Sequence, residues 1–199
     1  MPRPQTDIEA EKEKLLKEAE AALERQGGLK ITMSEIAARA GMSQSNAYRF
    51  FPSKAALLKA LIAGWFQAIE AELKIISEKQ EDPADQLRQY ILCQLQRKRE
   101  RFDKNPALFW AYLEIAAQNM DLIEQHVHVI HQGMTHLIGR LLVSKNLTHF
   151  DVAKATELAE DITSQFRDPR VIAVRRTDCT DERANAAIDF LTTGLCRPG

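Results

Sequence analysis

Hydrophobic residues recur every three or four positions along most of this chain, which is the spacing that places them on one face of an α-helix. The longest run extends from Ser53 to about Lys79. The same period returns in residues 7–26, 86–102, 105–120, 121–144, 149–166 and 180–195. Gly27-Gly28, Pro83 and Pro169 interrupt the runs, as helix-breaking residues do. The pattern predicts an all-α protein.

Composition narrows the class of protein further. The chain has 199 residues, of which 45% are hydrophobic, and it contains 8 glycines and 7 prolines, so we expect one or two helical domains with a sizeable core. Beyond an expected disordered arm at residues 1–6, no apolar signal core and no apolar run of eighteen residues occurs. Cys93, Cys179 and Cys196 are odd in number and lack metal-binding spacing, which fits a reducing compartment. We therefore expect a cytoplasmic protein with no membrane partner.

Residues 31–54 predict two short helices joined by a tight turn. Thr32 followed by Glu35 reads as a capping box, in which the hydroxyl and the carboxylate each satisfy a backbone amide. Gly41 can adopt the left-handed conformation that ends the first helix, and Ser43 can cap the second. Two short helices with such a turn form a helix-turn-helix.

The second short helix, residues 44–51, divides its residues between two faces. Ala47, Phe50 and Phe51 fall on the inner side. The outer side carries polar residues throughout: Gln44, Ser45, Asn46, Tyr48 and Arg49. A solvated surface would account for this face in an isolated helix. The surrounding helix-turn-helix favours a helix that enters the major groove of DNA, where amides, hydroxyls and guanidinium groups match the base edges.

We predict a division of labour among the DNA-binding side chains. Those expected to read base edges are Ser45, Asn46 and Arg49, with Gln44 as a further candidate. Those expected to hold the phosphate backbone through hydroxyls, helix N-termini and charge are Thr32, Ser43, Tyr48 and Lys54.

The charge distribution agrees with this prediction. The net charge of the whole chain is −1. Between Arg25 and Lys59, however, six basic residues face a single acid, Glu35. A basic segment in an otherwise acidic protein is typical of local contact with phosphates.

The segment TMSEIAARAGMSQSNAYRFFPSKAALL resembles the N-terminal signature of the TetR family of bacterial transcriptional regulators. The shared features are a threonine that opens the first motif helix, an I-A…A-G core, a serine cap, and Tyr-x-x-Phe followed by lysine at the next helix start; they span Leu16 to Ala63. Many members have histidine or another polar residue where this chain has Phe50, so we assign Phe50 to packing. The resemblance implies a three-helix DNA-binding domain, residues 7–60, and a helical ligand-binding and dimerisation domain, residues 61–199.

The last two predicted helices, residues 151–166 and 180–195, are amphipathic and rich in alanine and leucine. Each can bury one stripe on its own domain and another on a partner. In TetR-like proteins the last two long helices commonly form a four-helix dimer interface. We therefore expect a homodimer through these residues and a palindromic operator on double-stranded DNA. Charges at Leu158 and Leu191 are expected to split the dimer.

The segment ALFWAYLEIAAQNM, residues 107–120, has the highest aromatic density in the chain. Its apolar residues are either ordinary core or the wall of a cavity for a small apolar or aromatic effector. The long helix 53–79 is expected to contact the DNA-reading helices at one end and the body at the other, so a cavity beside it would act as a switch. The predicted lining residues are Trp65, Phe66, Cys93, Phe109, Trp110, Tyr112, Met120 and Met134.

Residues 121–144 hold four of the five histidines. Glu124, His128 and His131 fall within about 60° of each other on a helical wheel, but nothing nearby supplies the fourth ligand of a tetrahedral site. We expect neither a metal nor a cofactor. The sequence also lacks a nucleophile–base pair, paired carboxylates and a glycine-rich phosphate loop, so an enzyme is not expected.

Together these features predict a sequence-specific DNA-binding transcriptional regulator, specifically a repressor released from its operator by a small molecule. The alternative is a TetR-like DNA-binding protein with an architectural or protein-interaction role and no inducer.

Overall fold

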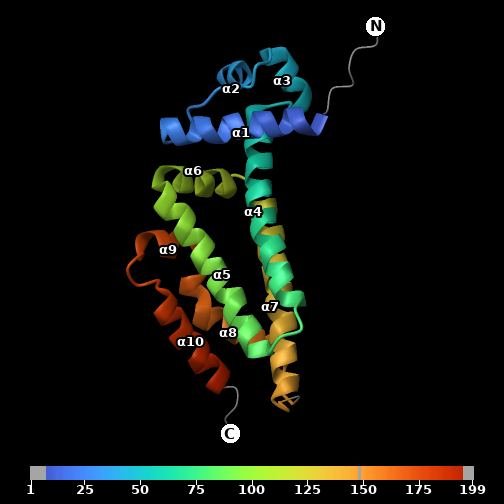
Figure 1. Ribbon diagram of the computed structural model, residues 1–199, viewed down its shortest axis with the longest axis vertical. Coiled ribbons are helices and arrows are strands. Elements are labelled where there is room, and N and C mark those ends of the chain that lie inside the picture. The colour runs from blue at the N-terminus through green and yellow to red at the C-terminus, as the bar shows by residue number, and fades with distance from the viewer. Residues whose placement is uncertain (1–7, 148, 195–199) are drawn as a thin grey trace. The chain divides into compact units, whose positions relative to one another are not determined.

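The computed structural model describes residues 8–147 and 149–194 (Figure 1). Within these residues the chain is helical and forms no strand, which confirms the all-α prediction. The helices are α1 (Ile8–Gln26), α2 (Met33–Arg39), α3 (Gln44–Phe50), α4 (Lys54–Glu78), α5 (Pro83–Lys104), α6 (Pro106–Ala117), α7 (Met120–Ser144), α8 (Val152–Thr163), the 3-10 helix η1 (Ser164–Phe166), α9 (Pro169–Val174) and α10 (Asp181–Gly194). The predicted N-terminal arm, Leu195 and Cys196 lie outside the described residues.

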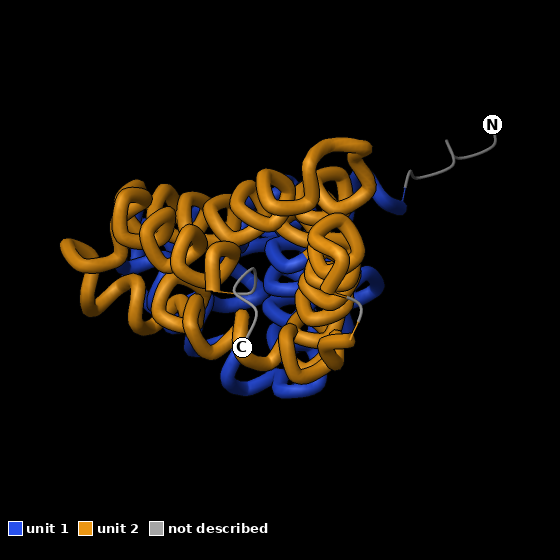
Figure 2. The backbone as a smooth tube through the Cα atoms, turned by 90° about the horizontal axis from the view of Figure 1, so that it is seen from below, with its two compact units in different colours: residues 1–66, 105–123 blue, residues 67–104, 124–199 orange. Residues whose placement is uncertain are grey.

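The chain forms two compact units (Figure 2). Unit 1 comprises residues 1–66 and 105–123, and unit 2 comprises residues 67–104 and 124–199. Helix α4 begins in unit 1 and ends in unit 2, and α7 also contributes residues to both.

In unit 1, α1 is the central helix. It packs against α2 and α3 on one side and against α6 on the other (Figure 1). Its buried side chains are Leu15, Ala19, Ala22 and Leu23, spaced three or four apart as the sequence predicts. Gly27 ends α1 with φ 63°, a left-handed conformation that glycine adopts without a steric penalty.

In unit 2, α5 packs along α10 and also contacts α9 and η1, while α8 packs on α10 and η1 (Figure 1). A core cluster joins α5, η1, α9 and α10 and consists of Leu95, Phe166, Ile172, Cys179 and Ala184. Cys179 is fully buried there, and burial raises the pKa of its thiol, so it acts as a small apolar residue of the core.

Two predicted boundaries are wrong. The run 105–120 does not form one helix, since α6 ends at Ala117. Just beyond this end, the Asn119 side chain donates from Nδ2 to the carbonyl of Ile115 at 2.8 Å. No predicted helix covers residues 167–179, yet Pro169–Val174 forms helix α9. Asp168 caps α9 by accepting from the Arg170 amide at 2.7 Å, and Pro169 occupies the first helical position, where its missing N–H costs nothing.

Candidate nucleic-acid interface and effector pocket

The turn between α2 and α3 is built by local hydrogen bonds. Thr32 Oγ1 accepts from the Glu35 amide at 3.2 Å and so caps α2. At the other end Gly41 has φ 72°, and the amides of Gly41 and Met42 donate to the carbonyls of Ala38 and Ala37. This is the hydrogen-bond pattern of a glycine-terminated helix. Together with the Ser43 cap on the Asn46 amide at 3.2 Å, it confirms the predicted helix-turn-helix.

The capping box is only half formed. The Glu35 carboxylate does not turn back onto the Thr32 amide but accepts from Gln26 Nε2 at 2.9 and 3.1 Å. Gln26 is the last residue of α1, so this contact joins α1 to α2. A tertiary partner has replaced the local one.

Helix α3 exposes to solvent the polar side that the sequence predicts to be the outer one. Ala47 is fully buried, and Phe50 and Phe51 are at least half-buried, in agreement with their assignment to packing. The residues of the polar side are exposed, apart from Asn46, which is half-buried: Gln44, Ser45, Tyr48 and Arg49. Thr32 and Ser43 are also exposed while they cap their helices. That these six side chains and Asn46 contact DNA stays a prediction.

Lys54 has a structural task that the sequence did not reveal. Its Nζ donates to the carbonyls of Leu29 and Ile31 at 3.0 and 3.1 Å. These two carbonyls belong to the loop between α1 and α2, so the start of α4 is tied to the loop that leads into the helix-turn-helix. An ammonium group has three N–H donors, and one remains for a phosphate.

The predicted aromatic residues of unit 1 form a packed core. Trp65 stacks on Phe66 with ring centroids 5.6 Å apart and on Tyr112 at 5.3 Å, and it meets the edge of Phe109 at 6.1 Å. Tyr112 donates its hydroxyl proton to Glu20 Oε1 at 2.6 Å. The rings of Trp65, Phe109 and Tyr112 therefore fill the space between them, as the core interpretation expects.

The other predicted cavity residues are dispersed. Trp110 is 43% exposed and Met120 is 54% exposed. Cys93 and Met134 belong to unit 2, where the Cys93 thiol lies 3.6 Å from Glu72 Oε2 and Met134 is fully buried. Their role in ligand binding stays a prediction.

The structure contains a pocket of about 550 Å³ within unit 2, and none of the eight predicted residues lines it. Its walls come from the second half of α4, from Tyr90 of α5 and from α7. The lining residues are Gln67, Glu70, Ala71, Leu73, Lys74, Ser77, Glu78, Tyr90, Val129, Gln132, Gly133 and His136. The sequence did not predict this pocket, because most of its α4 residues are polar and have the pattern of a solvent-exposed helix face.

A close approach between α5 and α7 shapes the pocket. The Tyr90 hydroxyl donates to the Ile130 carbonyl at 2.9 Å, and burial raises the pKa of this hydroxyl, so it remains a donor. A Cβ on Gly133 would overlap the Tyr90 hydroxyl and lie 2.8 Å from its Cζ. Only glycine therefore leaves room for this ring position. The signal in the sequence was a glycine in the middle of a strongly amphipathic helix.

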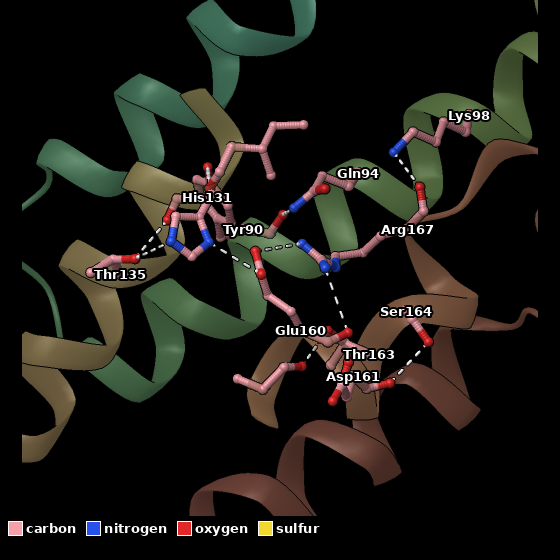
Figure 3. Close-up of polar contacts among 12 residues, drawn as sticks. Tyr90, Gln94, Lys98, His131, Thr135, Glu160, Asp161, Thr163, Ser164 and Arg167 are labelled. Atoms are coloured by element: carbon pink, nitrogen blue, oxygen red, sulfur yellow. Dashed lines mark hydrogen bonds and ion pairs between the residues drawn. The ribbon is translucent and has the colours of Figure 1, made fainter. Parts of the chain in front are cut away.

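A polar cluster joins α5, α7 and α8 beside this pocket (Figure 3). Glu160 of α8 accepts from His131 Nδ1 of α7 at 3.2 Å and from Arg167 Nη1 at 3.4 Å. The Arg167 carbonyl in turn accepts from Lys98 Nζ of α5 at 2.7 Å. Lys98 is 5% exposed, and burial, with a smaller contribution from the Arg167 guanidinium, lowers its pKa to about 7.

The candidate metal ligands do not assemble. His131 is engaged by Glu160, whereas Glu124 and His128 are exposed on α7. Over residues 8–147 and 149–194, no group of three potential ligands gathers closely enough to hold an ion. Nor does any helix in these ranges combine the length and hydropathy that a membrane crossing requires.

The predicted dimer helices α8 and α10 expose apolar side chains. Leu158 on α8 is 51% exposed and Phe190 on α10 is 72% exposed. On α10, Ala186, Phe190 and Thr193 are exposed at helical spacing. Leu191, however, is 3% exposed and belongs to the core of unit 2, so its use as a dimer probe is wrong. A charge there would unfold the unit rather than separate two chains.

Comparison with known families finds two matches along the chain. Residues 15–61 match the model described as bacterial regulatory proteins, tetR family. Residues 83–188 match the tetracyclin repressor-like C-terminal domain. The first match covers the helix-turn-helix, and the second covers most of unit 2.

Curated relatives match over a shorter stretch. Nucleoid occlusion factor SlmA of Shewanella frigidimarina is 40% identical over 60 residues, and that of Shewanella denitrificans is 38% identical over the same length. In both cases the match covers 30% of this chain and 30% of the relative.

Solved structures match over nearly the whole chain. SmeT, the repressor of the Stenotrophomonas maltophilia multidrug efflux pump SmeDEF, shares 20% identity with a TM-score of 0.66, covering 94% of each chain. The fatty acid degradation regulator FadR from Bacillus halodurans shares 16% identity with a TM-score of 0.58, covering 100% of each chain. At these identities the likeness establishes the fold.

Proposed function

The chain belongs to the TetR family of bacterial transcriptional regulators, and we propose that it is a homodimeric repressor that leaves a palindromic operator when a small molecule fills the pocket of unit 2. Binding to DNA through the helix-turn-helix is the general property of the family. The palindromic operator, the dimer interface, the repressor role, the release by a ligand and the use of this pocket are the proposed part.

The observation that carries the proposal is the extent of α4. Its first residue, Lys54, is hydrogen-bonded to the loop before α2. Seven residues of its second half, from Gln67 to Glu78, line the pocket. The same helix therefore has one end in the DNA-binding unit and the other at a candidate effector site.

A simple energetic argument explains how a bound ligand would release the protein from DNA. Two recognition helices of a dimer must enter successive major grooves on one face of the duplex, so their separation is constrained. A ligand that prefers the position of α4 in the DNA-incompetent state shifts the population toward that state. A preference of about 1–3 kcal/mol is typical of allosteric coupling and would lower operator affinity about 5- to 150-fold.

The nature of the ligand is supported by the pocket walls. The volume of about 550 Å³ is in the range of small-molecule sites. Ala71, Leu73, Val129 and Gly133 supply apolar surface, and Tyr90 supplies an aromatic side chain. The other lining residues are polar or charged, so a compound that combines an apolar or aromatic body with polar groups matches such walls.

The alternative role, an architectural or protein-interaction function, has one specific observation in its favour. The curated relatives that match over 60 residues are nucleoid occlusion factors, not operator-bound repressors by name. A genome-wide map of bound sites separates the two roles. We expect a few palindromic sites at promoters. Many sites dispersed over the chromosome would instead support the architectural role.

Substitutions on α3 and α4 test how the protein reads DNA. We expect Arg49→Ala to relax sequence preference at one base pair by about 1–3 kcal/mol, because a guanidinium that forks a guanine discriminates by that amount. We expect Lys54→Ala to weaken all sequences alike and to reduce the slope of affinity against salt by about one unit. Binding of a randomised operator library at several salt concentrations measures both effects.

Two controls accompany this experiment. Arg170→Ala removes an exposed arginine from unit 2 and should leave both preference and salt slope unchanged. Thermal unfolding of Lys54→Ala shows how much of its effect comes from the lost bonds to Leu29 and Ile31. Equal losses for every sequence in both the Arg49 and the Lys54 variants would contradict the proposed division of labour.

A further inference from the structure

The pocket of unit 2 has a carboxylate in its wall that retains acceptor capacity. Glu70 lies on α4, and its side chain is 23% exposed. Glu70 Oε1 accepts from His126 Nδ1 of α7 at 2.6 Å. Within residues 8–147 and 149–194, the bond to His126 is the hydrogen bond that the Glu70 side chain makes. A carboxylate has about four acceptor positions. Glu70 thus lines the pocket with acceptor capacity that the bond to His126 does not use.

The groups around Glu70 do not offset its charge. Burial lowers the pKa of His126, against the opposing effect of the Glu70 carboxylate, so the imidazole is neutral at neutral pH. Lys74, the basic residue of the lining, lies 3.7 Å from Glu78, and both side chains are mostly exposed. His136 and the Tyr90 hydroxyl complete the titratable groups of the lining. Among the lining residues, Glu70 therefore has no cationic partner within hydrogen-bonding distance.

A partly buried carboxylate without a counter-charge favours a positively charged ligand. Removal of a charge from water is costly unless a group of opposite sign takes the place of the water. The apolar side chains of Ala71, Leu73 and Val129 provide contact surface for the remainder of such a ligand. The lining therefore places the Glu70 carboxylate beside apolar side chains.

We propose that the pocket binds an organic cation, an apolar body that carries an ammonium group next to Glu70 Oε2. This proposal rests on the assignment of the pocket as the effector site. It adds a positive charge to the ligand class, which the apolar walls alone do not specify.

Calorimetric titration of the full-length protein with three probes of similar size tests the proposal. The probes are benzyltrimethylammonium, its neutral isostere neopentylbenzene, and phenylacetate as the anion. We expect the cation to bind at least tenfold more tightly than the neutral isostere and phenylacetate not to bind measurably. The expected ratio depends on charge alone, because the first two probes have the same shape.

Variants locate the charge that is responsible. Glu70→Gln keeps the size of the side chain and an acceptor for His126, and it should weaken the cation at least tenfold without changing the affinity of neopentylbenzene. Glu78→Gln is the matched control, since Glu78 lines the same pocket but its side chain is 66% exposed, and it should change neither affinity. Glu70→Asp retains the charge and should retain preference for the cation. Circular dichroism verifies that each variant is folded.

The possible outcomes separate this proposal from the proposed function. Equal affinities for the cation and its isostere, or an unchanged cation affinity in Glu70→Gln, would overturn the organic-cation assignment and leave the pocket as an apolar effector site. Absence of binding by all three probes would overturn the assignment and also remove this pocket from the proposed function.

Discussion

Charges placed on the exposed apolar faces of α8 and α10 should separate the dimer and nearly abolish operator binding. The variant is the pair Leu158→Glu and Phe190→Glu, because these side chains are 51% and 72% exposed in the single chain. Burying two carboxylates in an apolar interface without partners is strongly unfavourable. A monomer then binds one half-site without the effective concentration that a second linked half-site supplies, so affinity should fall by about a hundredfold or more.

Analytical ultracentrifugation gives the molecular mass, which should drop to that of a single 22.6 kDa chain. Mobility-shift titration of the palindromic operator gives the affinity. Val174→Glu places the same charge at an apolar residue of α9 that is 75% exposed, and this control should remain dimeric and bind DNA normally. A doubly substituted protein that stays dimeric, or a monomer with undiminished affinity, would show that the interface lies elsewhere.

Replacing Lys98 should stabilise the protein near neutral pH. The folded state holds this amine with a pKa of about 7, against the ordinary value of 10.5, so folding disfavours its proton. Below about pH 7 the amine is protonated in both states and the full penalty is present. Between about pH 7 and pH 10.5 the unfolded chain binds more protons, and the contribution of Lys98 to the free energy of unfolding rises with pH.

Lys98→Met removes this penalty and keeps most of the apolar volume. It also loses the hydrogen bond to the Arg167 carbonyl, which costs about 0.5–1.5 kcal/mol. We expect a net gain of about 1–3 kcal/mol in the free energy of unfolding at pH 7, and the gain should disappear toward pH 10.

Urea unfolding of the natural protein and the variant, from pH 6 to pH 10, measures this difference. Lys104→Met changes an exposed lysine of the same helix and should show a difference that does not depend on pH. A stability difference for Lys98→Met that is equally independent of pH would mean that the amine is not held neutral in the folded state.

The sequence predicts well those features that depend on neighbours within a few residues. The caps at Thr32 and Ser43 and the turn at Gly41 are local, and each forms as the residue types indicate. The faces of α3 follow from the helical period once Ala47 is placed inward. The match of residues 15–61 to the tetR-family model also supports a helix-turn-helix in this region.

Features that depend on distant residues escaped prediction. The sequence cannot show that Lys54 will reach two loop carbonyls more than twenty residues away, or that Glu35 will bond to Gln26 in place of Thr32. Aromatic density left two interpretations open, core or cavity wall, and the stacking of Trp65 on Tyr112 agrees with the core interpretation for these two rings. The actual pocket lies between polar and small residues, and helical periodicity cannot distinguish these from a solvated face.

Gly133 has a consequence for how the protein can diversify. The depth of the pocket at Tyr90 depends on a single position that has no side chain, and any other residue there would force the aromatic ring to move. For the proposed effector site, one codon in α7 would therefore determine which sizes of molecule fit beside Tyr90. The residues predicted to read the operator lie on α3, far away in the sequence. Under the proposed function, chemical sensitivity and the choice of target genes would change by separate mutations, so that such a regulator could acquire a new inducer and keep its operator.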